Sequence, residues 1–118
     1  MQIQPIRHED ERRILIEWNK DIPMKRSKVL IVKQKSVLGK HYHNNSDSIF
    51  YILKGKCILT TRMANREDAP VHRKWLFEGD CEFVPRGVIH RFEVFPDTVM
   101  LESATEPFNN NDEIQVTD

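Results

Sequence analysis

Three of the five histidines are spaced so that their side chains can meet at one point. His41 and His43 stand two residues apart, and alternate residues of an extended segment face the same side. His90 follows a Gly-Asp turn, a short apolar run and a Pro-Arg-Gly turn, so a second hairpin can carry it to the same place. Three converging imidazoles suit a divalent transition metal such as Zn, Fe, Ni or Mn. They equally suit proton transfer, because histidine titrates near neutral pH.

The elements that must position these side chains are short β-rich runs separated by turn signals. No segment has a sustained helical period, and residues 8–13 and 63–68 are predicted to be loop or a single turn. The pattern therefore predicts an all-β sandwich or barrel. The predicted strands are 14–18, 29–32, 49–53, 57–61, 75–77, 81–84, 92–95 and 99–101.

Composition narrows the function classes. The 118 residues are enough for one domain, and 18 basic residues balance 18 acidic ones. A net charge of zero removes the electrostatic argument for nucleic-acid or anionic-membrane binding. No apolar stretch approaches a membrane span, and residues 1–13 do not resemble a signal peptide. We therefore predict a cytoplasmic protein in which Cys57 and Cys81 are free thiols.

Two segments resemble the two motifs of the cupin superfamily. Residues 79–90 match the second motif, G-x5-P-x-G-x2-H, at its four fixed positions, although Val94 replaces the Asn that closes it. His41 and His43, followed by Gly55, are similar to the first motif, HxH-x(3,4)-E-x6-G. The resemblance implies a single-domain jelly-roll β-barrel (a double-stranded β-helix) over about residues 29–104. It also implies a homodimer and histidines in the barrel mouth. The polar composition of residues 105–118 separately predicts a loosely held C-terminal tail.

The first motif departs from the family at the acidic metal ligand, because Ser48 stands where cupins have Glu. Asp47 lies one position early, where alternation turns it to the opposite face unless a bulge intervenes. Three interpretations follow: a three-histidine metal site with open coordination positions, a four-ligand site completed by Asp47, or no tightly bound metal. We favour the first and retain His41, His43, His90 and Asp47 as the candidate ligands.

A second resemblance concerns the substrate. Residues 10–17 are similar to the D-x-R-G-x-L-x-E opening of cupins that act on nucleotide-linked deoxysugars, with Arg13 in place of Gly. Residues 39–41 resemble the G-x-H segment of the same 3,5-epimerases and 3,4-ketoisomerases. In that group the first His is a general base and no metal is required. The resemblance implies proton removal beside a sugar ketone, with His41 as base and an enolate held by His43, Tyr51 or Arg62.

The prediction is thus a carbohydrate isomerase or epimerase that uses His41, His43 and His90. A metal-dependent dioxygenase and a non-catalytic cupin that binds a small sugar or acid remain as alternatives, because a fold alone does not define function. Alternation places Phe50 and Ile52 inside the barrel. Tyr51 and Leu53 then face outward, and residues 2–6 form an edge strand that can also join a partner's sheet.

Overall fold

The computed structural model describes residues 1–19 and 21–116, and these ranges form twelve β-strands and no helix. Accordingly, they contain no helix that could cross a membrane. The strands are β1 (Gln2–Ile3), β2 (Ile6–Glu9), β3 (Ile14–Glu17), β4 (Arg26–Ile31), β5 (Ser36–His43), β6 (Ser48–Lys54), β7 (Lys56–Met63), β8 (His72–Phe77), β9 (Cys81–Val84), β10 (Val88–Val94), β11 (Val99–Ala104) and β12 (Glu113–Gln115).

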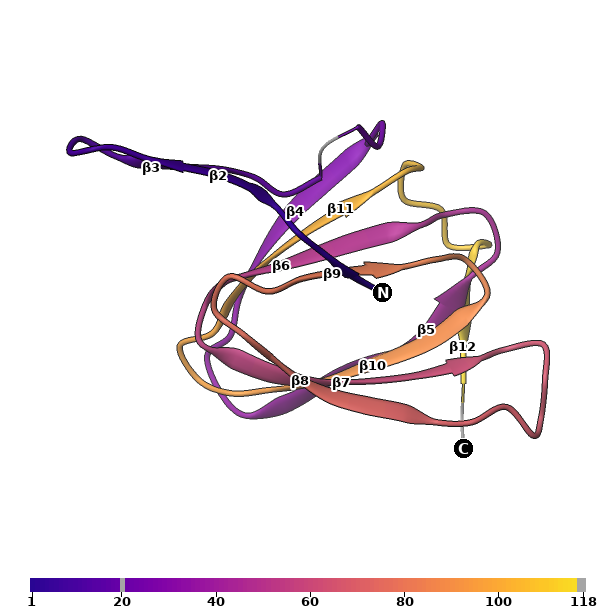
Figure 1. The fold of residues 1–118 in the computed structure, drawn as a ribbon. Coiled ribbons are helices and arrows are strands. Elements are labelled where there is room, and N and C mark those ends of the chain that lie inside the picture. Colours follow the sequence, from indigo (N-terminus) through magenta and orange to yellow (C-terminus); the bar gives the residue numbers. More distant parts are fainter. Residues whose placement is uncertain (20, 117–118) are drawn as a thin grey trace.

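Ten of these strands form two antiparallel sheets that enclose the barrel (Figure 1). The first sheet has the order β1-β9-β6-β11-β4, and the second has the order β12-β5-β10-β7-β8. Apart from the β7–β8 hairpin, every connection from β4 to β12 passes from one sheet to the other. This alternation is the jelly-roll arrangement, so the predicted all-β fold is confirmed.

Alternating side chains build the core between the sheets. In β10, His90, Phe92 and Val94 are buried, whereas the residues between them are half-buried. Their apolar members pack with Phe50 and Ile52 of β6, which confirms the predicted inward face of that strand. Burial of these side chains, each worth about 1.5–3 kcal/mol, fixes the register that carries His90 inward.

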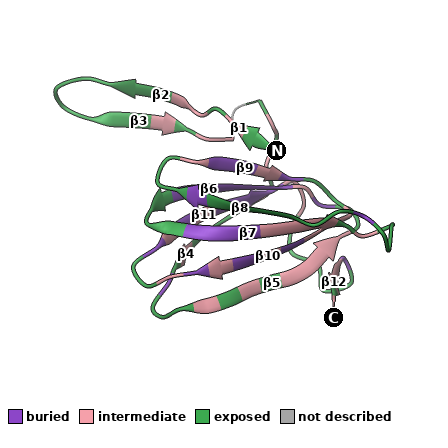
Figure 2. Ribbon diagram, turned by 60° about the horizontal axis from the view of Figure 1, so that its bottom comes forward, coloured by how far each residue is buried: buried purple, intermediate pink, exposed green. Residues whose placement is uncertain are grey.

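The outer face of the first sheet is only partly covered. Tyr51 faces outward as predicted, but it is buried under the chain's own N-terminal segment, including Ile16 and Trp18. The indole of Trp18 stacks on the Tyr51 ring at 6.3 Å between centroids. Leu53 stays exposed, and the β2–β3 hairpin projects beyond the body of the barrel (Figure 2).

The turn between β6 and β7 requires glycine. Gly55 has a φ of 87°, a conformation that side-chain-bearing residues rarely adopt. A Cβ atom added there would lie 2.6 Å from Oγ1 of Thr98. Thr98 is itself buried and bridges the turn, because its hydroxyl donates a hydrogen bond to the carbonyl of Lys56. The side chain of Thr98, just before β11, therefore connects β11 to the turn between β6 and β7.

The C-terminal tail is more ordered than the sequence predicts. Residues 113–115 form β12, which pairs with β5 at His41, Tyr42 and His43. Asp112 is buried, and its carboxylate accepts hydrogen bonds from the backbone N–H groups of Asn44 and Asn45. The prediction of a loosely held tail is wrong up to residue 116, because polar residues pair here with an edge strand.

The remaining predictions on the elements concern the N-terminus and the cysteines. Gln2 and Ile3 form β1, which lies at the edge of the first sheet, and Pro5 separates it from β2.

Cys57 and Cys81 are buried free thiols, as predicted. Burial raises the pKa of Cys57 to about 12 and that of Cys81 to about 11, so both thiols are unreactive at neutral pH.

Candidate functional site

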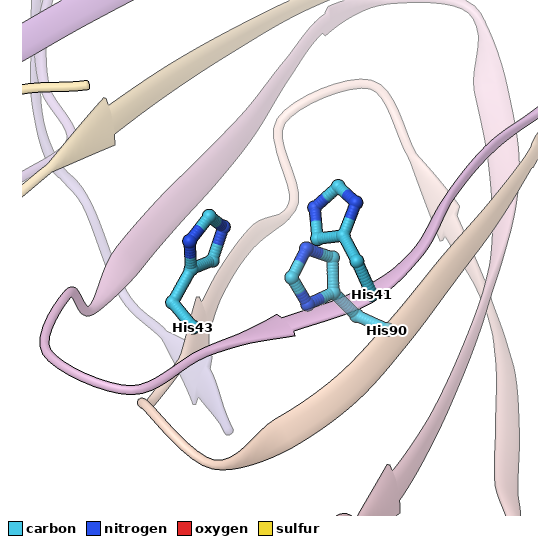
Figure 3. Close-up of side chains that lie close together, drawn as sticks. All are labelled: His41, His43 and His90. Carbon is cyan, nitrogen blue, oxygen red and sulfur yellow. The ribbon is translucent and has the colours of Figure 1, made fainter. Parts of the chain in front are cut away.

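His41, His43 and His90 meet in a cavity between the two sheets (Figure 3). The ring centroid of His41 lies 4.6 Å from that of His90 and 5.1 Å from that of His43. One ring nitrogen from each residue lies within 4.8 Å of the other two. His90 is buried and the other two rings are half-buried, so the predicted convergence of the three side chains is what the structure shows.

A β-bulge brings the first histidine into this position. His41 pairs with His90 and Gly39 pairs with Arg91, so Lys40 has no partner residue on β10. Gly39 and Lys40 both adopt left-handed conformations, with φ of 89° and 74°. A Cβ atom at Gly39 would lie 2.9 Å from the carbonyl oxygen of His90, which only glycine avoids. The bulge thus aims His41 at His90.

The Nδ1 atom of each ring has a neighbouring oxygen that can accept a hydrogen bond or an electrostatic contact. Nδ1 of His41 lies 3.1 Å from Oε1 of Glu113, and Nδ1 of His90 lies 3.2 Å from the carbonyl oxygen of Val88. Nδ1 of His43 lies 3.7 Å from Oδ2 of Asp112, a longer electrostatic contact. The two shorter contacts favour, at His41 and His90, the tautomer with the proton on Nδ1, so that Nε2 is the basic atom of those two rings.

Burial keeps two of the rings neutral. Desolvation lowers the pKa of His90 to about 3, and the neighbouring His41 adds to the shift. Desolvation also lowers the pKa of His41, although the Glu113 carboxylate opposes that shift. Both imidazoles are therefore unprotonated at neutral pH, the form that a metal ligand or a general base requires.

Asp47 does not join the histidines. Its carboxylate accepts hydrogen bonds from the backbone N–H and the guanidinium of Arg86, at 2.8 to 3.1 Å. Those hydrogen bonds hold the pKa of Asp47 below its ordinary value. Ser48 faces inward as alternation predicts, and its hydroxyl donates a 3.4 Å hydrogen bond to Glu102. Asp47 is thus engaged with the turn before β10, while Glu102 is the buried acid beside Ser48.

The cavity measures about 110 Å³ and contains groups that the sequence reasoning missed. Glu102 is buried on β11, and its Oε1 lies 3.3 Å from Nζ of Lys28 on β4. Arg26 lines the same cavity, and its guanidinium lies 5.5 Å from the ring centroid of Phe108. The site therefore combines the histidines with cations, an aromatic ring and the carboxylates of Glu102 and Glu113.

Part of this set was readable from the sequence. Glu102 shares the parity of the buried Met100, and Lys28 shares that of Leu30, so strand alternation turns both charges inward. Glu113 carried no such signal, because its place depends on the pairing of β12 with β5, seventy residues away. Phe108 lies outside any strand and had no periodic signal either.

The sequence model of the family described as Cupin matches residues 21–116, most of the chain. The chain belongs to the cupin family. The match includes both motifs, the bulge at Lys40 and the strand that carries Glu113.

Solved structures share this cupin's fold at low sequence identity. The TDP-fucose-3,4-ketoisomerase WlaRA from Campylobacter jejuni is 17% identical, with a TM-score of 0.86 over 98% of this chain and 88% of that one. The 3,4-ketoisomerase QdtA from Thermoanaerobacterium thermosaccharolyticum, solved as a mutant in complex with TDP-4-keto-6-deoxyglucose, is 18% identical, with a TM-score of 0.82 over 98% and 86%. NovW, a 4-keto-6-deoxy sugar epimerase from Streptomyces spheroides, is 13% identical, with a TM-score of 0.77 over 98% and 67%. A comparison with curated proteins found no match.

The donor set of this cupin fits a divalent transition metal. Three imidazoles that each place a ring nitrogen within 4.8 Å of the others are a common ligand set for such ions. Histidines that bind a metal usually donate the proton of their other nitrogen to a carboxylate or a backbone carbonyl. Glu113 and the Val88 carbonyl stand in those positions here, with Asp112 slightly farther away.

Two other predicted site residues lie elsewhere in the cupin. Tyr51 faces the outer side of the first sheet, and Arg62 lines a groove on the outer side of the second. Neither lines the cavity of the histidines, so the structure does not bring them to a substrate there. Of the three candidate donors to an enolate, only His43 lies in the cavity.

Proposed function

We propose that this cupin is an isomerase or epimerase that moves a proton on a keto sugar, with His41 as the base. The observation that carries the proposal is the contact between Nδ1 of His41 and Glu113 in a cavity that also holds two further imidazoles. A carboxylate at Nδ1 orients the ring and stabilises the imidazolium that forms when Nε2 accepts a proton. Partial burial keeps the base unprotonated before the substrate arrives.

The chemistry follows from these positions. Nε2 of His41 takes the proton from the carbon beside the ketone, and the electron pair of that C–H bond moves onto the carbonyl oxygen as an enolate. His43 faces the same space and is the donor that can hydrogen-bond this oxygen. Protonation of that carbon from its other face, by water or a second acid, inverts the centre, and the proton taken by His41 is released to solvent. Return of the proton to the former carbonyl carbon, after the neighbouring hydroxyl proton has moved, shifts the ketone along the ring.

Charge in the cavity supports a nucleotide-linked substrate. A diphosphate needs cationic or N–H partners, and Arg26 and Lys28 supply two cations beside the histidines. The ring of Phe108 offers a face on which a base can stack. Three cupins of the same fold carry names that refer to TDP-sugars or 4-keto-6-deoxy sugars. We therefore take a nucleoside-diphosphate-linked keto-deoxysugar as the substrate class.

Deuterium exchange tests this function. Incubation of the protein with TDP-4-keto-6-deoxyglucose in D₂O should replace a ring hydrogen beside the ketone, visible as the loss of its proton NMR signal. His41→Asn should slow this exchange by roughly 10²–10⁴-fold, the usual contribution of a general base, and still bind the sugar nucleotide. His72→Asn, at an exposed histidine outside the cavity, is the matched control. Binding without exchange in the wild-type protein would instead indicate a non-catalytic binding cupin.

A second candidate rests on the same three rings. We propose as an alternative that His41, His43 and His90 hold a Zn, Fe, Ni or Mn ion and that the enzyme is metal-dependent, a dioxygenase if the ion is iron. The Nδ1 contacts to Glu113 and the Val88 carbonyl favour it, since they leave Nε2 as the ligand atom. A bound ion supplies Lewis acidity to a substrate oxygen. Elemental analysis of purified protein, followed by exchange measurements after chelation, separates this candidate from the first.

We also infer that the cupin acts as a homodimer. One row of paired residues crosses the outer face of the first sheet from β6 to β4: Tyr51, Leu101 and Val29. The exposed fraction of the residue rises along this row from 5% at Tyr51 to 61% at Val29. Ile31, next outward on β4, is 70% exposed. The projecting β2–β3 hairpin exposes Ile14, and an isolated two-stranded ribbon is at best marginally stable in water. If the β2–β3 hairpin of one protomer packs on the exposed part of the first sheet of its partner, both apolar surfaces become buried.

Light scattering after size exclusion tests the dimer. Val29→Lys combined with Ile31→Lys should convert a dimer to a monomer that stays folded by circular dichroism, because charge then replaces apolar surface. Val37→Lys, at a residue 58% exposed on the second sheet, is the control and should remain dimeric. A wild-type protein that is monomeric at micromolar concentration would rule this interface out.

A further inference from the structure

A second cavity, of about 150 Å³, lies on the outer side of the second sheet, behind the histidines. We call it the outer basic groove. Three of its lining side chains are cations, and among the described residues none of them is an acid. Its lining residues are Lys40, Thr60, Thr61, Arg62, Val71, Ile89 and Arg91.

The strand register explains why the cations of the groove lie on the outer side of the second sheet while the histidines lie on its inner side. In β10, His90 lines the inner cavity, whereas Ile89 and Arg91 line the outer basic groove. In β5, the bulge turns His41 inward and leaves Lys40 on the outer side. Lys40 adopts its left-handed conformation at the position that delivers its ammonium group to the groove. Backbone strain of this kind is concentrated at functional sites.

Two polar atoms of the residues that line the groove have no hydrogen-bond partner among the described residues. These atoms, Nε of Arg91 and Oγ1 of Thr60, are both buried. They belong to residues that face each other across β10 and β7. Nη2 of Arg91 forms a long ion pair with Oε2 of Glu93, at 4.0 Å, which leaves Nε of Arg91 without a hydrogen bond. Buried polar groups in proteins are nearly always paired, and both atoms carry a hydrogen that an oxygen acceptor can receive.

We propose that the outer basic groove binds phosphate, either free or as the terminal group of a phosphorylated metabolite. One phosphate oxygen can accept from Arg91 Nε and another from the Thr60 hydroxyl, which pairs both buried atoms. A guanidinium edge matches the spacing of two phosphate oxygens, and the Lys40 ammonium adds the charge that a dianion requires. The site is separate from the catalytic cavity and does not rest on the function proposed for it.

Phosphate titration with backbone NMR tests the proposal. Metal-free protein is titrated with inorganic phosphate and, separately, with glycerol phosphate, with chloride held at constant ionic strength. We expect saturable shifts of the Lys40, Ile89 and Arg91 amides with at least one probe. Lys40→Asn, which keeps a residue tolerant of the left-handed conformation, and Arg91→Gln should each weaken binding about tenfold or more.

Two controls locate the bound phosphate. Lys28→Gln removes a cation from the histidine cavity, and Lys35→Asn removes one that lines neither cavity. At the Lys40, Ile89 and Arg91 amides of the outer basic groove, both variants should show the same phosphate affinity as the wild-type protein. Saturation by glycerol phosphate alone would identify a phosphorylated metabolite as the ligand. The proposal is overturned if neither probe saturates at millimolar concentration, or if Lys28→Gln or Lys35→Asn weakens binding as much as Lys40→Asn.

Discussion

Nδ1 of His41 lies 3.1 Å from Oε1 of Glu113, and the two residues come from paired strands of the second sheet. Glu113 belongs to the tail, so a segment that sequence reasoning left outside the barrel orients the residue proposed as the base. β12 thus has two roles: it closes one edge of the sheet, and it supplies the carboxylate that fixes the tautomer of His41.

Glu113→Gln should lower the rate of deuterium exchange by roughly 10–100-fold, the usual effect of losing a partner of a functional histidine. The reason is that an amide does not stabilise the imidazolium of His41 as a carboxylate does. The measurement is the exchange rate at saturating sugar nucleotide, together with the dissociation constant, which should change little. Glu106→Gln is the control, because Glu106 pairs with Lys25 outside the cavity. Equal effects of the two substitutions would contradict a positioning role.

The stability of the metal-free protein should depend on pH through His90. Its pKa is about 3 in the folded protein and near 6.5 when the chain is unfolded, so only the unfolded chain binds a proton between these values. The contribution of the neutral His90 ring to the free energy of unfolding is therefore fully present above about pH 6.5. It falls by about 1.4 kcal/mol per pH unit between that pH and about pH 3. His90→Gln should make this slope shallower in urea unfolding at about pH 7 and about pH 5.

An exposed histidine provides the comparison for that measurement. His72→Gln makes the same substitution at an exposed histidine outside the histidine cavity, and so reports the effect of the substitution itself. Parallel slopes in wild type and His90→Gln would show that the folded protein tolerates a protonated His90 and that desolvation is weaker than its burial implies.

Much of the fold was predictable because its signals are local. Period-two alternation in β6 placed Phe50 and Ile52 inside, and turn residues marked the strand ends. The turns at residues 78–80 and 85–87, on either side of β9, and the resemblance to the second cupin motif also set the spacing that returns His90 to the HxH pair. The meeting of the three histidines was predictable for these reasons.

The rest depended on contacts that sequence patterns do not encode. Asp47 directly precedes β6 and Glu113 is far along the chain, yet only Glu113 reaches a histidine. Arg86 draws Asp47 to the turn before β10, and a polar tail strand finds the open edge of β5. Both outcomes are long-range pairings, whose energies depend on geometry rather than on residue type.

Asp47 should matter for stability and not for metal binding. Asp47→Asn weakens the hydrogen bonds from Arg86, so the melting temperature should fall by a few degrees at neutral pH. The folded pKa of Asp47 is lowered, so its contribution is present above about pH 4 and is lost as the pH falls below that value. Zinc affinity, measured by competition with a chelator, should be unchanged. A large loss of zinc affinity would restore Asp47 as a ligand.

Gly55→Ala should destabilise the fold by about 1–3 kcal/mol more than Gly79→Ala does. Both glycines have positive φ, at 87° and 91°, so alanine meets the same backbone strain at each. They differ in their surroundings, because a Cβ at Gly55 lies 2.8 Å from the Cα of Thr98 and a Cβ at Gly79 has nothing within 4 Å. Urea unfolding of the two variants isolates the steric term. Equal losses would mean that β11 moves away from the turn freely, contrary to the burial of Thr98.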